Sequence, residues 1–263
     1  MLKSPLYPTD LTGEQWNIVA PLIPQPKTLG RPPRCRRTLL NGILYHVRSG
    51  GAWRLLPRDF GPWSTVYECF RAWRQAGIVE RIHAILCAQV RLEEGRHCNP
   101  TAAMVDSQSV KTSEHGGERG YDAGKKIVGR KRHVMVDTLG LVHLVRVTPA
   151  SVQDRDGART LLCGLAHSFC RLRRIWVDGG YSGSLIGWTA ALRKRNRIHM
   201  EVVSRSKRKG FHVLPKRWIV ERTFAWLMKF RRLRHDYEKL TSHSEAMIHL
   251  AMIAIMLKRL APS

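Results

Sequence analysis

The stretch Ile175-Trp-Val-Asp-Gly-Gly-Tyr181 starts as a short apolar run, reaches a carboxylate at Asp178 and breaks at two glycines. A similar design occurs upstream, where the run Thr101–Asp106 also ends on a carboxylate. Short apolar runs bounded by turn residues are typical of buried strands. We therefore predict two buried strands, each of which ends on an aspartate.

Strand and helix patterns alternate around these two runs. The expected order is β-β-β-α-β-α-β-α, with strands at 101–106, 133–137, 141–147, 174–178 and 198–203 and helices at 154–165, 184–195 and 216–234; a last helix follows from about 242. Three consecutive strands followed by alternation indicate a mixed five-stranded sheet with helices, an α/β fold. The segment 111–132, rich in Gly and Lys, is predicted to be irregular, and loops of that length are usually functional.

The first 96 residues carry helical signals instead. Thr65-Val-Tyr-Glu68 has the form of a capping box, and the helix that it would open leaves Arg71 and Arg74 on the outside. Short helices, a Gly/Pro turn and an Arg-bearing second helix favour a helix-turn-helix-like DNA reader, with a plain helical bundle as the alternative. We divide the chain into a small all-α domain, 1–96, and an α/β domain, 97–263.

The charge of the chain points to a polyanionic partner. Lys and Arg number 45 against 20 Asp and Glu, a formal net charge of +25 that is spread along the chain. A folded protein tolerates such self-repulsion best when it acts on a polyanion, although general solubility charge is the bland alternative. No basic helical face lies opposite a bulky apolar one, no apolar run is long enough to span a bilayer, and no signal peptide is evident. We expect a cytosolic, nucleic-acid-binding protein without membrane contact.

The sequence contains no motif for a zinc site or a nucleotide cofactor. The six cysteines form no C-x-x-C pair, and the twelve histidines show no zinc-site spacing, so we predict reduced thiols and no zinc. Gly120-Tyr-Asp-Ala-Gly-Lys-Lys126 is similar to a phosphate-binding P-loop, but it is one residue short and lacks the Ser or Thr after its lysine. A nucleotide cofactor is therefore not expected.

A third acid completes a candidate site. Glu221 is the only acid between Glu201 and Asp236, in a predicted helix with many basic neighbours. It is either the centre of a salt-bridge cluster or a metal ligand that the surrounding positive charge presents to a phosphate. Phosphodiester cleavage needs an activated oxygen and a stabilised, charged transition state, and two Mg²⁺ ions held by carboxylates supply both. We therefore group Glu221 with Asp106 and Asp178.

At these residues the chain resembles the DDE transposases of bacterial insertion sequences, in particular the insertion-sequence-five family. The matching stretches, in order, are Val105-Asp106-Ser-Gln-Ser-Val-Lys-Thr112, Gly129-Arg-Lys-Arg-His-Val-Met-Val-Asp-Thr-Leu-Gly-Leu141, Val147-Thr-Pro-Ala-Ser-Val-Gln-Asp-Arg-Asp-Gly157, Val177-Asp-Gly-Gly-Tyr181 and Trp218-Ile-Val-Glu-Arg-Thr-Phe-Ala-Trp226. The resemblance runs from about Leu11 to Leu260. It departs from the family pattern on both sides of Glu221. Leu214 stands where the family often has a Tyr, and Met228 stands where it often has a Lys.

The resemblance implies a ribonuclease-H-like catalytic fold in which Asp106 and Asp178 lie side by side and a helix brings Glu221 over them. It also implies two Mg²⁺ per active site, with Mn²⁺ as a substitute. The enzyme would bind the terminal inverted repeats of its element, cut a strand, and join the freed 3′-hydroxyl to target DNA. It would act as a homodimer on double-stranded DNA in the bacterial cytosol, associated with the nucleoid. A DNA-binding protein without catalysis is the alternative.

Basic residues near the predicted site and in the predicted recognition helix are candidate DNA contacts. They are Arg71, Arg74, Lys125, Lys126, Arg130, Lys131, Arg217 and Arg222. Two further acids are assigned structural roles. Asp137 is expected to serve the hairpin at 138–140, and Asp154 the N-terminus of a helix, where the helix dipole favours an anion.

Overall fold

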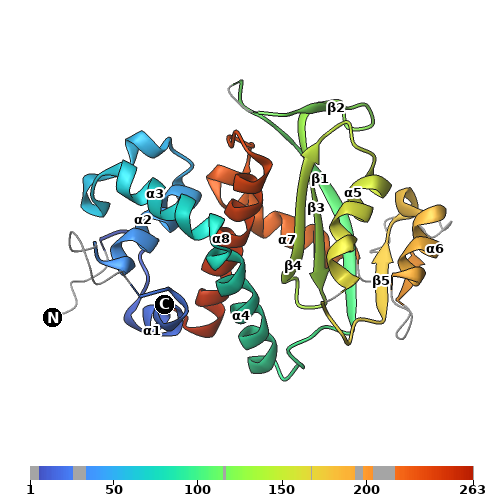
Figure 1. Cartoon of the computed structure of the whole chain (residues 1–263), viewed down its shortest axis with the longest axis horizontal. Coiled ribbons are helices and arrows are strands. Elements are labelled where there is room, and N and C mark those ends of the chain that lie inside the picture. Colours follow the sequence, from blue (N-terminus) through green and yellow to red (C-terminus); the bar gives the residue numbers. More distant parts are fainter. Residues whose placement is uncertain are drawn as a thin grey trace. The chain divides into compact units, whose positions relative to one another are not determined.

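A computed structural model describes residues 6–25, 34–114, 117–166, 168–192, 198–203 and 217–262 of the chain (Figure 1). The chain forms two compact units: the first contains Met1–Glu94, Lys229–Arg234 and Ala246–Ser263, and the second contains Gly95–Met228 and His235–Glu245. The sequence-based division at residue 96 places 229–234 and 246–263 in the α/β domain, whereas the structure groups them with the helical first unit. None of the described helices is long and apolar enough to cross a membrane.

The first unit is helical in its described part. It consists of α1 (Gly13–Val19), α2 (Arg36–Ser49), α3 (Trp63–Gln75), α4 (Ile78–Glu93) and most of α8 (Thr241–Leu260), with short 3-10 turns η1 (Ala20–Leu22), η2 (Trp53–Leu55), η3 (Arg58–Phe60) and η6 (Arg231–Leu233). Helix α2 ends at Gly50, whose φ of 78° is the left-handed conformation that glycine adopts without strain.

Helix α3 begins earlier than the sequence pattern predicts. Pro62 occupies the N-cap position and Trp63 the first helical one, so Thr65 lies inside the helix and does not cap it. The capping box expected at Thr65 is therefore wrong. The reason is that the fixed backbone of a proline leads into a helix without a capping side chain, which allows the first turn to form two residues before Thr65.

The described part of the second unit is built on one six-stranded mixed sheet. Its strands are β1 (Ala102–Lys111), β2 (Gly120–Asp122), β3 (Ile127–Asp137), β4 (Val142–Pro149), β5 (Arg174–Val177) and β6 (His199–Val202). Strand β1 is central: it pairs antiparallel with β3 and parallel with β5, and β5 pairs parallel with β6. The far edge of β3 carries both β2 and β4, so β2 is the strand that the five-stranded prediction lacks.

The segment 111–132, predicted to be irregular, contributes two of these strands. Strand β2 and the first part of β3, from Ile127, lie within it. Strand β3 has no apolar alternation there because its charged side chains, Arg130 to Arg132, are buried. A search for alternating apolar residues cannot detect a strand whose buried side chains are charged and form ion pairs.

Helices cover both faces of the sheet. Helix α5 (Asp154–Leu162) packs on β3 and β4, α6 (Ser184–Ala191) packs on β6, and α7 (Arg217–Met228) packs on β1 and β3 (Figure 1). Turns η4 (Cys163–Ala166) and η5 (Gly179–Tyr181) precede and follow β5.

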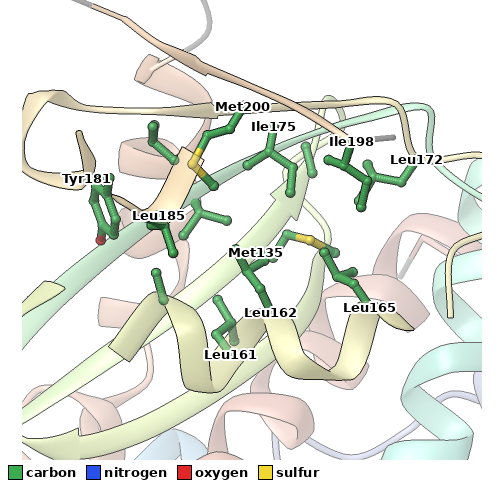
Figure 2. Close-up of a cluster of buried hydrophobic side chains, with 14 residues drawn as sticks. Met135, Leu161, Leu162, Leu165, Leu172, Ile175, Tyr181, Leu185, Ile198 and Met200 are labelled. Carbon is green, nitrogen blue, oxygen red and sulfur yellow. The ribbon is translucent and has the colours of Figure 1, made fainter. Parts of the chain in front are cut away.

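Alternate side chains of the two central strands face different helices. Val105 of β1 and Val177 of β5 belong to an apolar core with Leu161 and Leu162 of α5 (Figure 2). Because side chains alternate along a strand, the intervening residues of β1 and β5 point to the opposite face. That face is the one on which Val220 of α7 lies.

Candidate active site

The two predicted aspartates lie at the same level of two neighbouring strands. Met104 of β1 is paired with Trp176 of β5 in the parallel register. Continuing that register by two residues puts Asp106 opposite Asp178, on the face that looks toward α7. Both belong to one small pocket, whose lining residues are Met104, Val105, Asp106, Trp176, Val177, Asp178, Val203 and Val220.

The main chain orients each carboxylate. Oδ1 of Asp106 accepts a hydrogen bond of 2.7 Å from the backbone N–H of Ser107. Oδ1 of Asp178 accepts one of 2.9 Å from the backbone N–H of Gly180, and Asp178 thereby caps the short turn η5. Both side chains are half-buried. Asp106, inside β1, and Asp178, just after the end of β5, are thus each oriented by a local contact while they border the pocket.

Glu221 is the neighbour in sequence of a residue that lines this pocket. It follows Val220, which lines the pocket, and its side chain is exposed on α7. In the part of the chain that the structure describes, no three His, Cys, Asp or Glu side chains are arranged to hold a metal ion. The structure therefore brings Asp106 and Asp178 to one pocket, and in its described part it does not form a three-acid metal group with Glu221.

Glu201, the other glutamate that soon follows Asp178 in the sequence, has a different environment. It lies in β6, opposite Trp176 in the register. Its Oε2 accepts a hydrogen bond of 2.9 Å from Nε1 of Trp176 and lies 3.9 Å from Nε of Arg174. Glu201 is therefore engaged by the neighbouring strand.

The aspartate pair has the chemistry of a divalent metal site. Mg²⁺ prefers oxygen ligands, and it commonly binds one or two protein carboxylates together with substrate phosphates. Two carboxylates from adjacent strands at one pocket meet that requirement. Asp106 and Asp178 therefore fit such a cation, whereas Glu221 would have to approach from α7.

A tyrosine and an aspartate beside the pair were not assigned to the site from the sequence. Tyr181 is almost completely buried. Burial, together with the nearby carboxylates of Asp106 and Asp154, raises the pKa of its hydroxyl well above the usual 10. The tyrosine therefore keeps its proton between these acids. The position of Tyr181, three residues after Asp178, was the only sequence signal that could have placed it at the site. That its ring is buried there is seen only in the folded structure.

Three of the basic candidates in the second unit keep exposed surface: Lys125 and Lys126 are exposed, and Arg222 is half-buried. Lys125 and Lys126 lie in the turn between β2 and β3. On α7, the guanidinium of Arg222 lies 4.6 Å from the ring centroid of Trp218 and 4.5 Å from that of Trp226, and it donates to the carbonyl of Leu139. The side chain of Arg217 lies outside the described part of the structure.

Two other candidates are interior residues, which corrects their expected role as DNA contacts. Arg130 has no exposed surface and pairs with Asp236 at 3.1 Å. Lys131 is also buried, and its Nζ lies 2.9 Å from the carbonyl of Val152 and 3.1 Å from Asp154. Their adjacent positions in a basic run looked like a surface loop, but ion pairs with distant residues allow this part of β3 to be buried.

The arginines of the first unit lie on α3. Arg71 is exposed and forms an ion pair of 2.7 Å with Glu68, one helical turn earlier. Arg74 is half-buried. An ion pair between two such exposed side chains is weak, so Arg71 can exchange its partner for a phosphate at little cost.

Comparison with known proteins identifies the class to which this fold and site belong. Residues 98–257 match the family described as "Transposase DDE domain". This match covers more than half of the chain, so the chain belongs to the DDE transposase domain family. Residues 11–83 match the family described as "Putative transposase of IS4/5 family". The chain is thus a DDE transposase of the insertion-sequence-four/five group, which confirms the resemblance seen in the sequence and implies the ribonuclease-H-like fold.

Similar proteins occur in the bacteria Burkholderia cepacia and Sinorhizobium fredii. The chain is 34% identical over 117 residues to "Insertion element IS402 uncharacterized 16.2 kDa protein" of Burkholderia cepacia, covering 42% of this chain and 78% of that protein. It is 32% identical over 118 residues to "Putative transposase for insertion sequence element IS402" of the same organism, covering 42% and 54%. It is 29% identical over 117 residues to "Uncharacterized protein y4sN" of Sinorhizobium fredii, covering 44% and 87%.

Proposed function

We propose that this transposase binds the terminal inverted repeats of its insertion sequence and cuts and rejoins DNA strands at a metal site based on Asp106 and Asp178. The observation that carries the proposal is the parallel register of β1 and β5, which sets the two carboxylates at one level beside one pocket. The membership of the chain in the DDE transposase family supports it.

Divalent cations, two Mg²⁺ or Mn²⁺ in their place, supply a Lewis acid that activates a hydroxyl nucleophile and stabilises the charged phosphate during an in-line displacement. The chain's own acids would hold the cations: Asp106 and Asp178 would provide oxygen ligands, and Glu221 of α7 would provide a third. The same site serves hydrolysis by water and attack by a 3′-hydroxyl, so no nucleotide cofactor is needed.

The basic residues supply DNA binding. Lys125, Lys126 and Arg222 lie around the sheet of the second unit, and Arg71 and Arg74 lie on α3 of the first. With a formal net charge of +25, binding releases many counterions, so affinity falls steeply with salt. Because two element ends must be cut and joined together, we further propose a homodimer on DNA.

The test is a nicking assay with the full chain on a labelled DNA that carries the element end. We expect cutting with Mg²⁺ or Mn²⁺, none with EDTA, and binding in both conditions. Asp106→Asn and Asp178→Asn should each abolish cutting while they preserve binding, because the amide keeps the shape but removes the charge that a metal requires. Asp156→Asn, in an exposed pair with Arg159, is the matched control and should cut normally. Cutting by either pocket variant would exclude that residue as a ligand.

A second candidate function is DNA binding without catalysis, since the described residues hold no group of three His, Cys, Asp or Glu side chains arranged for a metal ion. A chain whose third ligand never reaches the site would bind element ends and repress its own gene without cutting. Such a protein would shift end DNA but would nick none of it at any metal concentration.

A further inference from the structure

A row of polar side chains lies on the face of β1 opposite Asp106. The hydroxyl of Ser107 donates to Oδ1 of Asp154 at 2.7 Å, and the hydroxyl of Ser109 donates to Oδ2 of Asp122 at 2.5 Å. Nζ of Lys131 stands between the two acids, 3.1 Å from Asp154 and 3.7 Å from Asp122. One ammonium of β3 thus links two acids that receive hydrogen bonds from β1.

Most of this row is buried. The side chain of Lys131 is 7% exposed and that of Asp122 10%, whereas that of Asp154 is 35% exposed. Charges withdrawn from water are costly unless they are paired, and losing one partner leaves the other uncompensated. The row is therefore held in one arrangement, because each charged member depends on the others.

The row lies on the part of β1 that follows the last residue paired with β5. Pairing with β5 covers only Ala102 to Met104, although pairing with β3 continues to Lys111. In the described ladders, Asp106 therefore stands on a part of β1 that lies beyond the pairing with β5 and within the pairing with β3. The hydrogen bonds from the hydroxyl groups of Ser107 and Ser109 also hold this segment in place.

Helix α5 fixes Asp154 against the sheet. Asp154 is its first residue, and Gly157 lies one turn later. A Cβ on Gly157 would stand 2.1 Å from Cε1 of His133 in β3, so only glycine allows this approach. The helix is thus seated closely on β3, and its first turn delivers Asp154 to Ser107.

Ser107 joins the two acids from opposite sides of β1. Its backbone N–H donates to Oδ1 of Asp106, and its hydroxyl donates to Oδ1 of Asp154. We propose that Asp154 is a positioning residue for the catalytic Asp106, acting through Ser107, and that Lys131 holds Asp154 in place for this task. This inference rests on the proposed function. Outer partners of this kind orient metal ligands, and their loss commonly lowers metal affinity or activity about 10- to 100-fold.

The test compares Asp154→Asn and Ser107→Ala with Asp156→Asn, which removes a charge from the same turn of α5 but from its exposed side. In the full chain with end DNA, we measure the nicking rate, the Mn²⁺ concentration for half-maximal nicking, Mn²⁺ binding by electron paramagnetic resonance, and the unfolding temperature. We expect both Ser107→Ala and Asp154→Asn to nick about 10- to 100-fold more slowly and to need more Mn²⁺. The double variant should be no slower than the slower single one, and Ser107→Thr, which keeps the hydroxyl, should nick close to normally.

The outcomes separate this role from a structural one and from the proposed function itself. A purely structural role would lower the unfolding temperature but leave the Mn²⁺ requirement of the folded fraction unchanged, which would overturn the inference. So would variants that nick at the normal rate while the unaltered chain nicks and Asp106→Asn does not. An unaltered chain that neither nicks nor binds Mn²⁺ would overturn the proposed function, and the positioning role with it.

Discussion

Arg130 and Asp236 form an ion pair of 3.1 Å in which neither side chain has more than 1% of its surface exposed. Arg130 also donates to the carbonyl of Glu238 and to the hydroxyl of Ser244, which itself donates to Asp236. The pair joins β3 to a segment 106 residues later in the chain. It therefore fastens the return of the chain, 235–245, to the sheet of the second unit.

Asp236→Asn should strongly destabilise the second unit, by about 3–5 kcal/mol, because Arg130 would remain buried with its charge uncompensated. Urea unfolding of the full chain, followed by circular dichroism, measures the loss. The control is Asp156→Asn, which breaks an exposed pair of 3.8 Å with Arg159 and should cost no more than about 1 kcal/mol. Equal losses in the two variants would contradict a structural role for the buried pair.

Gly157→Ala should also destabilise the second unit, by about 1–3 kcal/mol, because the added methyl group overlaps the ring of His133. Gly187→Ala is a matched control, since Gly187 lies in α6 and a Cβ there meets nothing within 4 Å. It should be neutral or stabilising by up to about 1 kcal/mol, as alanine is the better helix former. Thermal unfolding of both variants decides the question, and equal melting temperatures would refute the close approach of α5.

His133 should make stability depend on pH below neutrality. Burial is the main cause that lowers the pKa of its imidazole from the usual 6.5 to about 4. The unfolded chain therefore binds a proton that the folded chain refuses, so this contribution is complete above about pH 6.5 and is lost as the pH falls toward about 4.

Between about pH 7 and about pH 5, the loss from His133 should be about 2 kcal/mol. Urea unfolding at the two pH values measures it. His133→Gln, which cannot take up the proton, should lose less stability than the unaltered chain over that interval. A variant with the same pH dependence as the unaltered chain would show that His133 is not the responsible group.

Glu221→Gln should abolish nicking and preserve DNA binding, whereas Glu201→Gln should keep substantial activity. Glu201 is already engaged by the indole N–H of Trp176, and the amide oxygen of Gln can accept the same hydrogen bond. Glu221 lies on the helix that borders the aspartate pocket, next to Val220. Nicking of a labelled element end by the two variants side by side is the measurement. If Glu221→Gln cuts and Glu201→Gln does not, the third ligand is on β6 and not on α7.

Some features of the protein followed from local sequence. The apolar run before Asp106 forms the first part of β1, which continues to Lys111 and so does not end at Asp106 as predicted; the run before Asp178 forms β5, and the turn at 138–140 joins β3 to β4. Asp137 serves that hairpin as expected, because its Oδ1 accepts from the backbone N–H groups of Leu139 and Leu141. These features are readable because each depends on neighbours within a few residues. The family was readable for the same reason, since its motifs are continuous stretches.

Other features depended on residues that meet only in the folded chain. The sequence predicted an irregular, DNA-contacting segment where Arg130 and Lys131 form a buried part of β3, because their partners, Asp236 and Asp154, lie far along the chain. A charged side chain can be buried when it forms an ion pair with an opposite charge. The periodicity of apolar residues in the sequence does not indicate where that partner lies. The link from Asp154 to Asp106 through Ser107 is of the same kind. The sequence by itself determined the acids and the strands that carry them, and the packing of α5 and β3 on β1 decided which other charges reach them.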